Sequence, residues 1–451
     1  MSNHDTPLPL SFRADLLSRM MPSLRAGECC SLVGTSGVGK SNLVRFLRRQ
    51  DVQAAYWGGD RTWVVVADTH SLVYAEQPVE FVVAELMIHR LVLEIESRIG
   101  AGELSGWASD LHTRLLAQPS ALLAMRYLER ICARLCEGCQ LQIVFLFDQF
   151  EDLWRDADAR FFLNLRNLRD QFKYQLAYLV LTREPLKRGR ADLPAVEAFW
   201  ELFDSHTYGL GMYGEADAQE MVRRLELRSG SALDPARRRA AIALSGGHPG
   251  LLRAVFWALS RSPALEPEAA ALLEVGAVAE ECRKLWGDLS ESEQRLARLI
   301  AGGLAPRQER EATLDGLRLK EIVVGKPPAL FSPLFGAYVI RQSGADVAGV
   351  VVVPALRQVW LDGQPLEKQL SPLEFGLLAY LARHVGTVCR REDILRELYK
   401  EKEQSYSASD ERLDTILRRL RDALSEDARN PRYLITHRGV GVQLTHGLLQ
   451  E

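Results

Sequence analysis

Residues 34–41 of this 451-residue chain have the sequence Gly34-Thr35-Ser36-Gly37-Val38-Gly39-Lys40-Ser41. The stretch fits the pattern G-x-x-x-x-G-K-[ST] at every defined position. In such a loop the glycines let backbone N–H groups close around a β-phosphate, Lys40 reaches the β and γ oxygens, and the Ser41 hydroxyl ligates Mg²⁺. An apolar run precedes the loop and a helical pattern follows it. The stretch therefore predicts a phosphate- and magnesium-binding loop between a strand and a helix, and we include Asn42, the next residue, in the binding set.

The first 212 residues alternate short apolar runs with helical patterns. Continuous apolar strands separated by helices are typical of a parallel sheet that is covered on both faces. The fold class predicted for this segment is therefore α/β, with the phosphate loop at the end of one strand. The helical patterns include Asn42–Arg49, Val79–Ile99 and Ala108–Cys136. The apolar runs are Cys29–Val33, Trp63–Ala67, Ile143–Phe147, Tyr178–Thr182 and Thr207–Met212.

Polar residues stand at the carboxyl ends of two of these runs, where a parallel sheet places its ligand crevice. Asp148 ends the run 143–147 and is the candidate second Mg²⁺ site, through water. Glu151 is the candidate to polarise an attacking water, although an acid there also suits the start of the next helix. Thr182 and Arg183 end the following run and can point at a γ-phosphate. The alternative for Arg183 is an ordinary surface arginine.

The remainder of the chain changes pattern several times, which suits its length, because one core rarely serves more than about 250–300 residues. Residues 269–341 contain helices and a Gly325-Lys326-Pro327-Pro328 turn between two apolar segments, a pattern typical of a winged helix. After a small, polar stretch come strands, three helical patterns and a closing β-pair. We predict five segments: the core at 1–212, a helical lid at 213–268, a first winged helix at 269–341, a linker at 342–349 and a C-terminal domain at 350–451.

Composition narrows the class of protein. Hydrophobic residues are 47% and charged residues 25% of the chain, which suits a globular protein, and the formal net charge of -3 gives no bulk attraction to nucleic acid or membrane. The start has no secretory pattern, and no run of about 18 apolar residues occurs. Seven scattered cysteines fit a reducing cytoplasm. Cys132, Cys136 and Cys139 have the spacing of some iron–sulfur ligands, but they end a helical pattern, so we expect them to pack a helix end.

The C-terminal domain contains a strongly amphipathic segment, Ser409–Leu424, with leucines on one face. Such a helix fits a major groove, and Arg438 lies at a following glycine-rich turn that fits a minor groove. Acidic and basic residues nearly balance in this region, so a solvated charged helix is the alternative interpretation. The candidate DNA contacts on the helix are Arg412, Arg418, Arg419 and Arg421.

Four blocks follow one another in order within residues 10–340: the loop at 34–41, Asp148-Gln149-Phe150-Glu151-Asp152, Thr182-Arg183 and Gly247-His248-Pro249. In this order they resemble the STAND class of signalling ATPases, which is related to the origin-recognition branch of the AAA+ ATPases. The third segment, with Leu285-Trp286 and residues 331–335, resembles the winged helix that follows the ATPase in this class.

The resemblance implies a nucleotide and two residue roles. It implies ATP rather than GTP, with Mg²⁺. Arg183 corresponds to the arginine that contacts the γ-phosphate, and Pro249 to the proline placed near the adenine. AAA+ enzymes carry glutamate directly after the Walker B aspartate, whereas this chain has Gln149 there. Slow hydrolysis, with ATP acting mainly as a switch, is therefore expected.

A second resemblance covers residues 350–446. Its residues are Leu370-Ser371-Pro372-Leu373-Glu374-Phe375, Gly386 to Arg391, the segment Leu413 to Arg421 and the turn Thr436 to Gly441. The domain resembles the OmpR/PhoB-type winged helix of bacterial response regulators, and Arg418, Arg419, Arg421 and Arg438 match basic residues that this family uses on DNA. Val442 stands where the family usually has an aromatic residue, and the acids Glu411 and Asp422 flank the helix.

Together these patterns predict an ATP-dependent regulator that binds double-stranded DNA, most plainly a regulator of transcription. One alternative is a DNA-associated ATPase of a replication-initiator-like, mobile-element or defence system. Another is a signalling ATPase whose C-terminal winged helix binds protein. Self-association is compatible with the sequence, with Arg223 and Arg224 among the candidates for an arginine reaching a neighbouring subunit's ATP. No membrane partner is expected, and the activating signal is not encoded in any pattern found.

Overall fold

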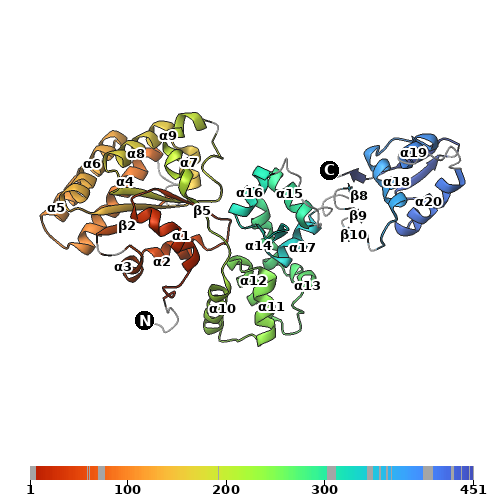
Figure 1. Ribbon diagram of the computed structural model, residues 1–451, viewed down its shortest axis with the longest axis horizontal. Helices are drawn as coiled ribbons and strands as arrows, with labels where there is room; N and C mark the ends of the chain where they lie inside the picture. The colour runs from red at the N-terminus through yellow and green to blue at the C-terminus, as the bar shows by residue number, and fades with distance from the viewer. Residues whose placement is uncertain are drawn as a thin grey trace. The chain divides into compact units, whose positions relative to one another are not determined.

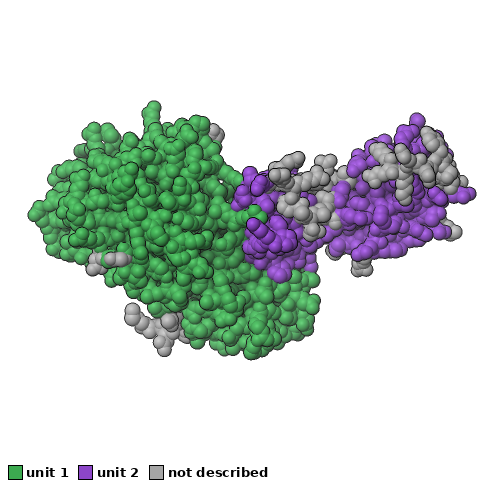
Figure 2. Space-filling view, in the orientation of Figure 1, with its two compact units in different colours: residues 1–288, 316–322 green, residues 289–315, 323–451 purple. Residues whose placement is uncertain are grey.

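The computed structural model consists of two compact units (Figure 2). Unit 1 comprises residues 1–288 and 316–322, and unit 2 comprises residues 289–315 and 323–451. The structure describes residues 7–57, 59, 61–69, 77–190, 192–301, 311–342, 349–354, 357–361, 364–366, 368–399, 410–427, 431–437, 439–445 and 447–449.

Unit 1 is built on a five-stranded sheet of parallel strands in the order β2-β3-β4-β1-β5 (Figure 1). Strands β1 and β4 are buried along their whole length, which explains why they are continuous apolar runs rather than alternating ones. All five predicted strands are present, and the α/β fold class is confirmed. The strands are β1 (Cys30–Val33), β2 (Thr62–Asp68), β3 (Gln142–Asp148), β4 (Leu176–Thr182) and β5 (Thr207–Gly209).

Helices cover both faces of this sheet (Figure 1). One prediction was wrong in detail, because the helical pattern Ala108–Cys136 forms two helices. Pro119 interrupts it, since proline cannot continue a helix, and the Ser120 hydroxyl accepts the Leu123 N–H to begin the second. The helices are α1 (Ala14–Arg25), α2 (Lys40–Leu47), α3 (Gln50–Trp57), α4 (Val79–Arg98), α5 (Glu103–Ala117), α6 (Ala121–Ala133), α7 (Phe150–Asp156), α8 (Ala159–Gln171) and the short α9 (Glu197–Trp200).

A purely helical segment follows β5 in unit 1, and its first three helices lie within the predicted lid, residues 213–268. Asp234 caps its second helix and His248 its third through their side chains, and Gly246 and Gly247 take the left-handed conformation between these two helices. The helices are α10 (Glu215–Ser229), α11 (Pro235–Ser245), α12 (Pro249–Arg261), α13 (Ala269–Leu273) and α14 (Gly276–Gly287).

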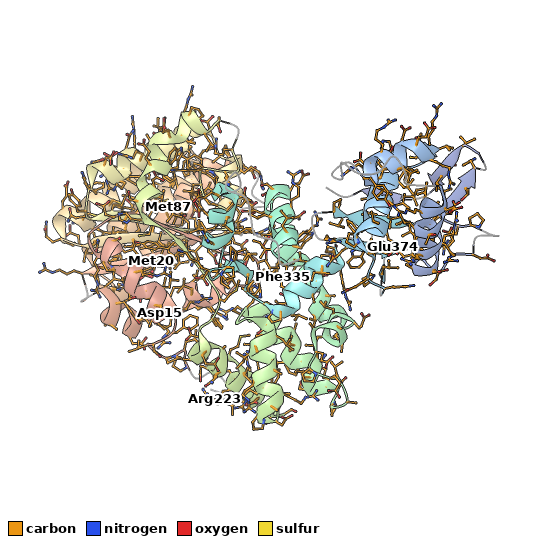
Figure 3. All side chains as sticks on the ribbon, turned by 45° about the vertical axis from the view of Figure 1, so that its right-hand side comes forward. Asp15, Met20, Met87, Arg223, Phe335 and Glu374 are labelled. Atoms are coloured by element: carbon orange, nitrogen blue, oxygen red, sulfur yellow. The ribbon has the colours of Figure 1, made fainter. Side chains whose placement is uncertain are left out.

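Unit 2 begins with helices and a two-stranded hairpin, in the region that was predicted as the first winged helix. Ser332 caps the last helix, on which Phe335 is buried (Figure 3). The predicted turn at 325–328 joins two antiparallel strands. The unit boundary crosses the segment 269–341, because α13 and α14 belong to unit 1 and α16 (Glu311–Leu319) spans the boundary, so its bounds as one domain stay a prediction. The elements in unit 2 are α15 (Glu291–Ala301), β6 (Val323–Val324), β7 (Ala329–Leu330) and α17 (Pro333–Arg341).

The C-terminal part of unit 2 has the predicted order of strands, three helices and a hairpin. Ser371 and Glu374 form a capping box at the start of α18 (Figure 3). Leucines of α18 and α20 share one core with the hairpin strands. The predicted linker lies mostly outside the described residues. The elements are β8 (Val350–Val353), β9 (Gln358–Leu361), β10 (Gln364–Pro365), α18 (Pro372–Arg383), β11 (Cys389–Arg390), α19 (Arg391–Leu398), α20 (Asp410–Ala423), β12 (Leu434–His437), β13 (Gly441–Leu444) and β14 (Gly447–Leu449).

The three closely spaced cysteines near the end of α6 differ in burial. Cys132 and Cys136 are buried and Cys139 is exposed, and within the described ranges no group of three potential ligands could hold a metal ion. Burial raises the pKa of the Cys136 thiol to about 12, so this cysteine packs as a neutral side chain. None of the described helices is long and apolar enough to cross a bilayer.

Candidate functional site

The phosphate loop lies where the sequence places it, between β1 and α2. Gly37 and Gly39 have φ angles of +76° and +98°, a region that side chains rarely adopt. A Cβ on Gly34 would also come within 2.9 Å of the Val38 side chain. The Gly34 N–H donates to Thr182 O at 2.9 Å, which fixes the loop's start against the end of β4. The glycines therefore serve the backbone shape that phosphate binding requires.

Lys40 begins α2 and its ammonium group lies inside the loop. Its Nζ donates to Gly34 O at 2.5 Å and to Thr35 O at 3.2 Å. Burial lowers the pKa of Lys40, while the carboxylates of Glu151 and Asp288 act in the opposite direction. The ammonium is thus a concentrated positive charge at the loop's centre, as its predicted contact with β and γ oxygens requires.

Two carboxylates stand side by side at the ends of neighbouring strands. Asp148 ends β3, and Asp68, which ends β2, is its partner in the strand register. Burial raises the pKa of Asp148, and the charge of Asp68 raises it further. A divalent cation would relieve this repulsion, which suits the magnesium role predicted for Asp148. Sequence reasoning missed Asp68, although its position at the end of an apolar run was a usable indication.

Glu151 and Arg183, predicted separately, form an ion pair. Glu151 lies in the first turn of α7, and Arg183 Nε lies 2.9 Å from its Oε1. Beside them Thr182, the last residue of β4, is buried, and its hydroxyl has no hydrogen-bond partner among the described residues. The predicted water-polarising acid and the predicted γ-phosphate arginine are therefore ion-paired with each other, and both line the same cavity.

Most of the predicted nucleotide residues line one cavity of about 620 Å³ in unit 1. They come from the loop, α2, the end of β3, α7, the end of β4 and the lid. Gly34, Val38 and Thr182 support the wall without lining it. The predicted residues that line the cavity are Thr35, Ser36, Gly37, Gly39, Lys40, Ser41, Asn42, Asp148, Glu151, Arg183 and Pro249.

A second cavity of about 340 Å³ shares Asn42 with the first and is lined by aromatic rings. Phe12, Phe46 and Tyr213 supply those rings, and Asn42 Nδ2 donates to the Tyr213 hydroxyl at 3.3 Å. A recess with aromatic rings in its wall, next to a phosphate site, suits a purine base. No sequence motif marks Phe12 or Tyr213, which lie about 200 residues apart in the chain.

Arg13 is a further residue that sequence reasoning missed. Its guanidinium stacks on the Tyr213 ring at 4.6 Å and donates to Val38 O at 2.6 Å and to Gly211 O at 2.5 Å. Its backbone N–H donates to Asp217 Oδ2 at 3.0 Å. Arg13 therefore ties the start of the chain to the phosphate loop and to the beginning of the lid.

The lid contributes further arginines to these cavities. Arg228 lines both cavities and Arg253 the larger one, and the sequence analysis named neither. Arg223 lies on α10 at the rim of the lid and pairs with Glu220 (Figure 3). Arg224 also pairs with Glu220, and it donates to Pro7 O. The two arginines proposed for a neighbouring subunit are thus engaged within the chain.

In the C-terminal domain α20 presents a mixed charged face. Arg412, Arg418 and Arg419 are exposed, as are the acids Glu411 and Asp422. Arg421 is half-buried, and its Nη2 donates to Leu434 O at 2.9 Å and to Thr436 Oγ1 at 2.7 Å. Arg421 therefore connects α20 to strand β12 of the hairpin by hydrogen bonds, a role that the sequence did not indicate. Arg438 lies outside the described residues.

Comparison with known proteins supports the two parts to different degrees. Residues 364–444 match the model of the family "Transcriptional regulatory protein, C terminal". The C-terminal domain is a winged helix of the OmpR/PhoB type. The DNA-binding domain of RstA from Klebsiella pneumoniae, solved in complex with the RstA box, is 28% identical over 22% of this chain and 94% of its own length, with a TM-score of 0.20.

Two other solved structures are similar to a longer part of the chain. A Walker-type ATPase of Pyrococcus abyssi is 17% identical over 72% of this chain and 95% of its own, with a TM-score of 0.45. The ORC2 protein of Aeropyrum pernix, solved with ADPNP and ADP, is 14% identical over 76% and 97%, with a TM-score of 0.38.

Proposed function

We propose that this protein is an ATP-binding regulator of transcription that binds double-stranded DNA through its C-terminal winged helix. One observation carries the proposal. A single cavity joins the loop lysine, the Asp148 carboxylate and the Glu151–Arg183 pair in a chain that also has a transcription-regulator domain. A cytoplasmic location, self-association and STAND-type signalling stay predictions.

The residues present fit a nucleoside triphosphate with Mg²⁺. The bound cation supplies charge neutralisation between the β and γ phosphates. Ser41 and Asp148 would hold it, Asp148 through water, and Lys40 with the loop's N–H groups would bind the phosphates. The aromatic recess at Phe12 and Tyr213 would take the base, with Pro249 of the lid beside the loop. These assignments rest on two cavities that adjoin each other, because residues such as Asn42 and Arg228 line both of them.

Slow hydrolysis follows from the residue chemistry around Glu151. A carboxylate that polarises water must be free to accept its proton, whereas Glu151 is paired with Arg183. Gln149 occupies the position after Asp148, and an amide cannot act as a general base. We propose that ATP acts mainly by binding, with occasional turnover when the pair opens onto the γ-phosphate.

The test of function is capture of genomic DNA fragments on the purified full-length protein, with ATP·Mg²⁺ and without nucleotide. A short motif enriched only with ATP supports a nucleotide-gated regulator. Broad binding without a motif, which weakens steeply with salt, supports the DNA-associated ATPase instead. No binding at low salt under either condition supports a winged helix that binds protein, an outcome that the acids Glu411 and Asp422 on α20 make worth testing.

Two variants separate the two proposed sites. Lys40→Ala should weaken ATP binding at least a hundredfold, because Lys40 is the only lysine among the described residues that line this cavity. The exposed Lys173→Ala is the matched control. Replacing Arg418 and Arg419 together should weaken duplex binding and leave ATP affinity unchanged, with Arg383→Ala on α18 as control. Tight ATP binding by Lys40→Ala, or unchanged DNA affinity of the double variant, would contradict the corresponding site.

A further inference from the structure

Residues 36 and 37 of the phosphate loop are hydrogen-bonded by three residues outside the loop that phosphate binding does not require. The Ser36 N–H donates to Asp288 Oδ2 at 2.5 Å, and the Ser36 hydroxyl donates to Asp288 Oδ1 at 3.1 Å. Ser36 O accepts a bond from His248 Nε2 at 3.0 Å, and Gly37 O accepts the Gly250 N–H at 3.1 Å. Both backbone polar groups of Ser36 are therefore in use.

Asp288 differs from the other partners because it places a carboxylate on an N–H of the loop. Hydrogen bonds to an ionised acceptor are roughly twice as strong as neutral ones. N–H groups of such loops are also the groups that attract phosphate. Asp288 further contributes a negative charge to the surroundings of Lys40, as its effect on the pKa of that lysine shows. The carboxylate therefore shares the electrostatic field in which a terminal phosphate would lie.

A buried lysine links Asp288 to the end of β4. Lys320 has a fully buried side chain, and its Nζ donates to Asp288 O at 3.1 Å. The same Nζ lies 3.6 Å from Glu184 Oε1, and Glu184 follows Arg183 directly. The contact at Ser36 is thus connected to the predicted γ-phosphate arginine by a chain of polar groups.

The chain leaves unit 1 immediately after Asp288, and again after Ile322. Just before that second exit, Glu321 accepts the Met212 N–H at 2.9 Å. Both exits therefore follow residues that are hydrogen-bonded to the nucleotide-binding part of unit 1. Asp288 is therefore the last residue of unit 1 on this side and is joined through its peptide bond to residue 289, the first residue of unit 2.

We propose that Asp288 is the specificity-determining residue by which this site distinguishes ATP from ADP. The inference rests on the proposed function, because it requires nucleotide at the loop. ADP adds no charge beyond the β-phosphate, so Asp288 keeps its bonds to Ser36. The γ-phosphate of ATP brings negative charge toward the same part of the loop and repels the carboxylate, since like charges disfavour each other strongly away from bulk water. ATP binding therefore releases Asp288, and ADP binding retains it.

The test is nucleotide affinity of full-length Asp288→Asn, measured for ATP·Mg²⁺ and for ADP by calorimetry. The asparagine keeps the size and one acceptor oxygen but removes the charge. ATP should bind on the order of tenfold more tightly than to the unaltered protein, equivalent to about 1.4 kcal/mol, while ADP affinity changes less than twofold. Glu280→Gln is the matched control, because it removes a carboxylate on the same helix that pairs with Arg283.

A second variant and a second measurement keep the test decisive. Ser36→Ala removes one of the two bonds to Asp288 and leaves the N–H, so it should shift the ATP-to-ADP ratio in the same direction by about two- to threefold. Hydrogen exchange of the peptide covering residues 280–290 should rise with ATP and not with ADP in the unaltered protein. In Asp288→Asn the exchange should be raised without nucleotide.

The two ways of failing are distinguishable. An unchanged ATP-to-ADP ratio in Asp288→Asn, with tight binding of both nucleotides, overturns the role of Asp288 and leaves the proposed function standing. Loss of ATP and ADP affinity together in Asp288→Asn also overturns it, because the residue would then support the loop. If the unaltered protein binds neither nucleotide, the proposed function itself fails.

Discussion

His248 is a buried imidazole whose two nitrogens have fixed and different tasks. Its Nδ1 accepts the Leu251 N–H at 3.1 Å, which begins α12, so Nε2 carries the proton and donates to Ser36 O. Burial lowers the pKa of His248 from its ordinary value of 6.5 to about 4. The neutral ring is a fixed bridge between the lid and Ser36 of the loop, beside the charged contact of Asp288.

The lowered pKa of His248 predicts a loss of stability in mild acid. The unfolded chain binds a proton near pH 6.5 and the folded chain only near pH 4. The stabilising effect is therefore complete above pH 6.5 and is lost as pH falls toward 4. Between pH 7 and pH 5 the free energy of unfolding should drop by about 2 kcal/mol more than in His248→Gln. Urea unfolding of the full chain measures this free energy. The transition to follow is the one whose midpoint moves when nucleotide is added. Parallel pH profiles of the two proteins would contradict the prediction.

At the scale of single residues, the sequence predicted the positions of residues that belong to local motifs. The loop, Asp148 and Arg183 stand at strand ends and could be placed there from the sequence alone. Arg13 and Tyr213 could not, because their stacking joins segments 200 residues apart through tertiary packing alone. The role of Asp288 could not be predicted either. An aspartate after a helix is usually a surface residue, and only the fold brings this one to Ser36.

Among the elements, apolar runs were the most reliable guide and helical periodicity the less reliable one. The buried strands β3 and β4 extend the predicted runs by one or two residues. Periodicity alone continued through Pro119 and joined α5 to α6, because the apolar spacing persists on both sides of the proline. The amphipathic pattern of α20 was placed within one residue at each end.

The attachment of α20 to the hairpin gives a prediction at the scale of elements. Arg421 donates to Leu434 O and Thr436 Oγ1, so Arg421→Ala leaves two acceptors without their charged donor. The free energy of unfolding of unit 2 should fall by about 1–3 kcal/mol. The exposed Arg418→Ala is the matched control, which should change stability by less than about 0.5 kcal/mol. Chemical denaturation of the full-length variants measures the free energy of unfolding. If Arg421→Ala and Arg418→Ala were equally stable, Arg421 would not stabilise the contact between α20 and the hairpin.

For the whole molecule, the proposed nucleotide site lies entirely in unit 1 and the proposed DNA surface in unit 2. A regulator in which ATP controls DNA binding must therefore couple two sites that share no residue. Coupling of this kind is reciprocal, because the free energy that ATP adds to DNA binding equals the free energy that DNA adds to ATP binding. A ligand with equal affinity for both states of the molecule shifts nothing, however tightly it binds.

Reciprocity gives the strongest test of the molecule as a switch. If ATP tightens DNA binding by a factor within the usual range of roughly 5- to 150-fold, saturating duplex should tighten ATP binding by the same factor. The measurement is the dissociation constant of each ligand with and without the other, at one salt concentration, since duplex affinity falls with salt. The variant lacking Arg418 and Arg419 should lose the effect of duplex on ATP affinity, because it no longer engages DNA. Factors of one in both directions would show that the two units bind their ligands independently, and the chain would then be a DNA-binding protein joined to an ATPase without being regulated by it.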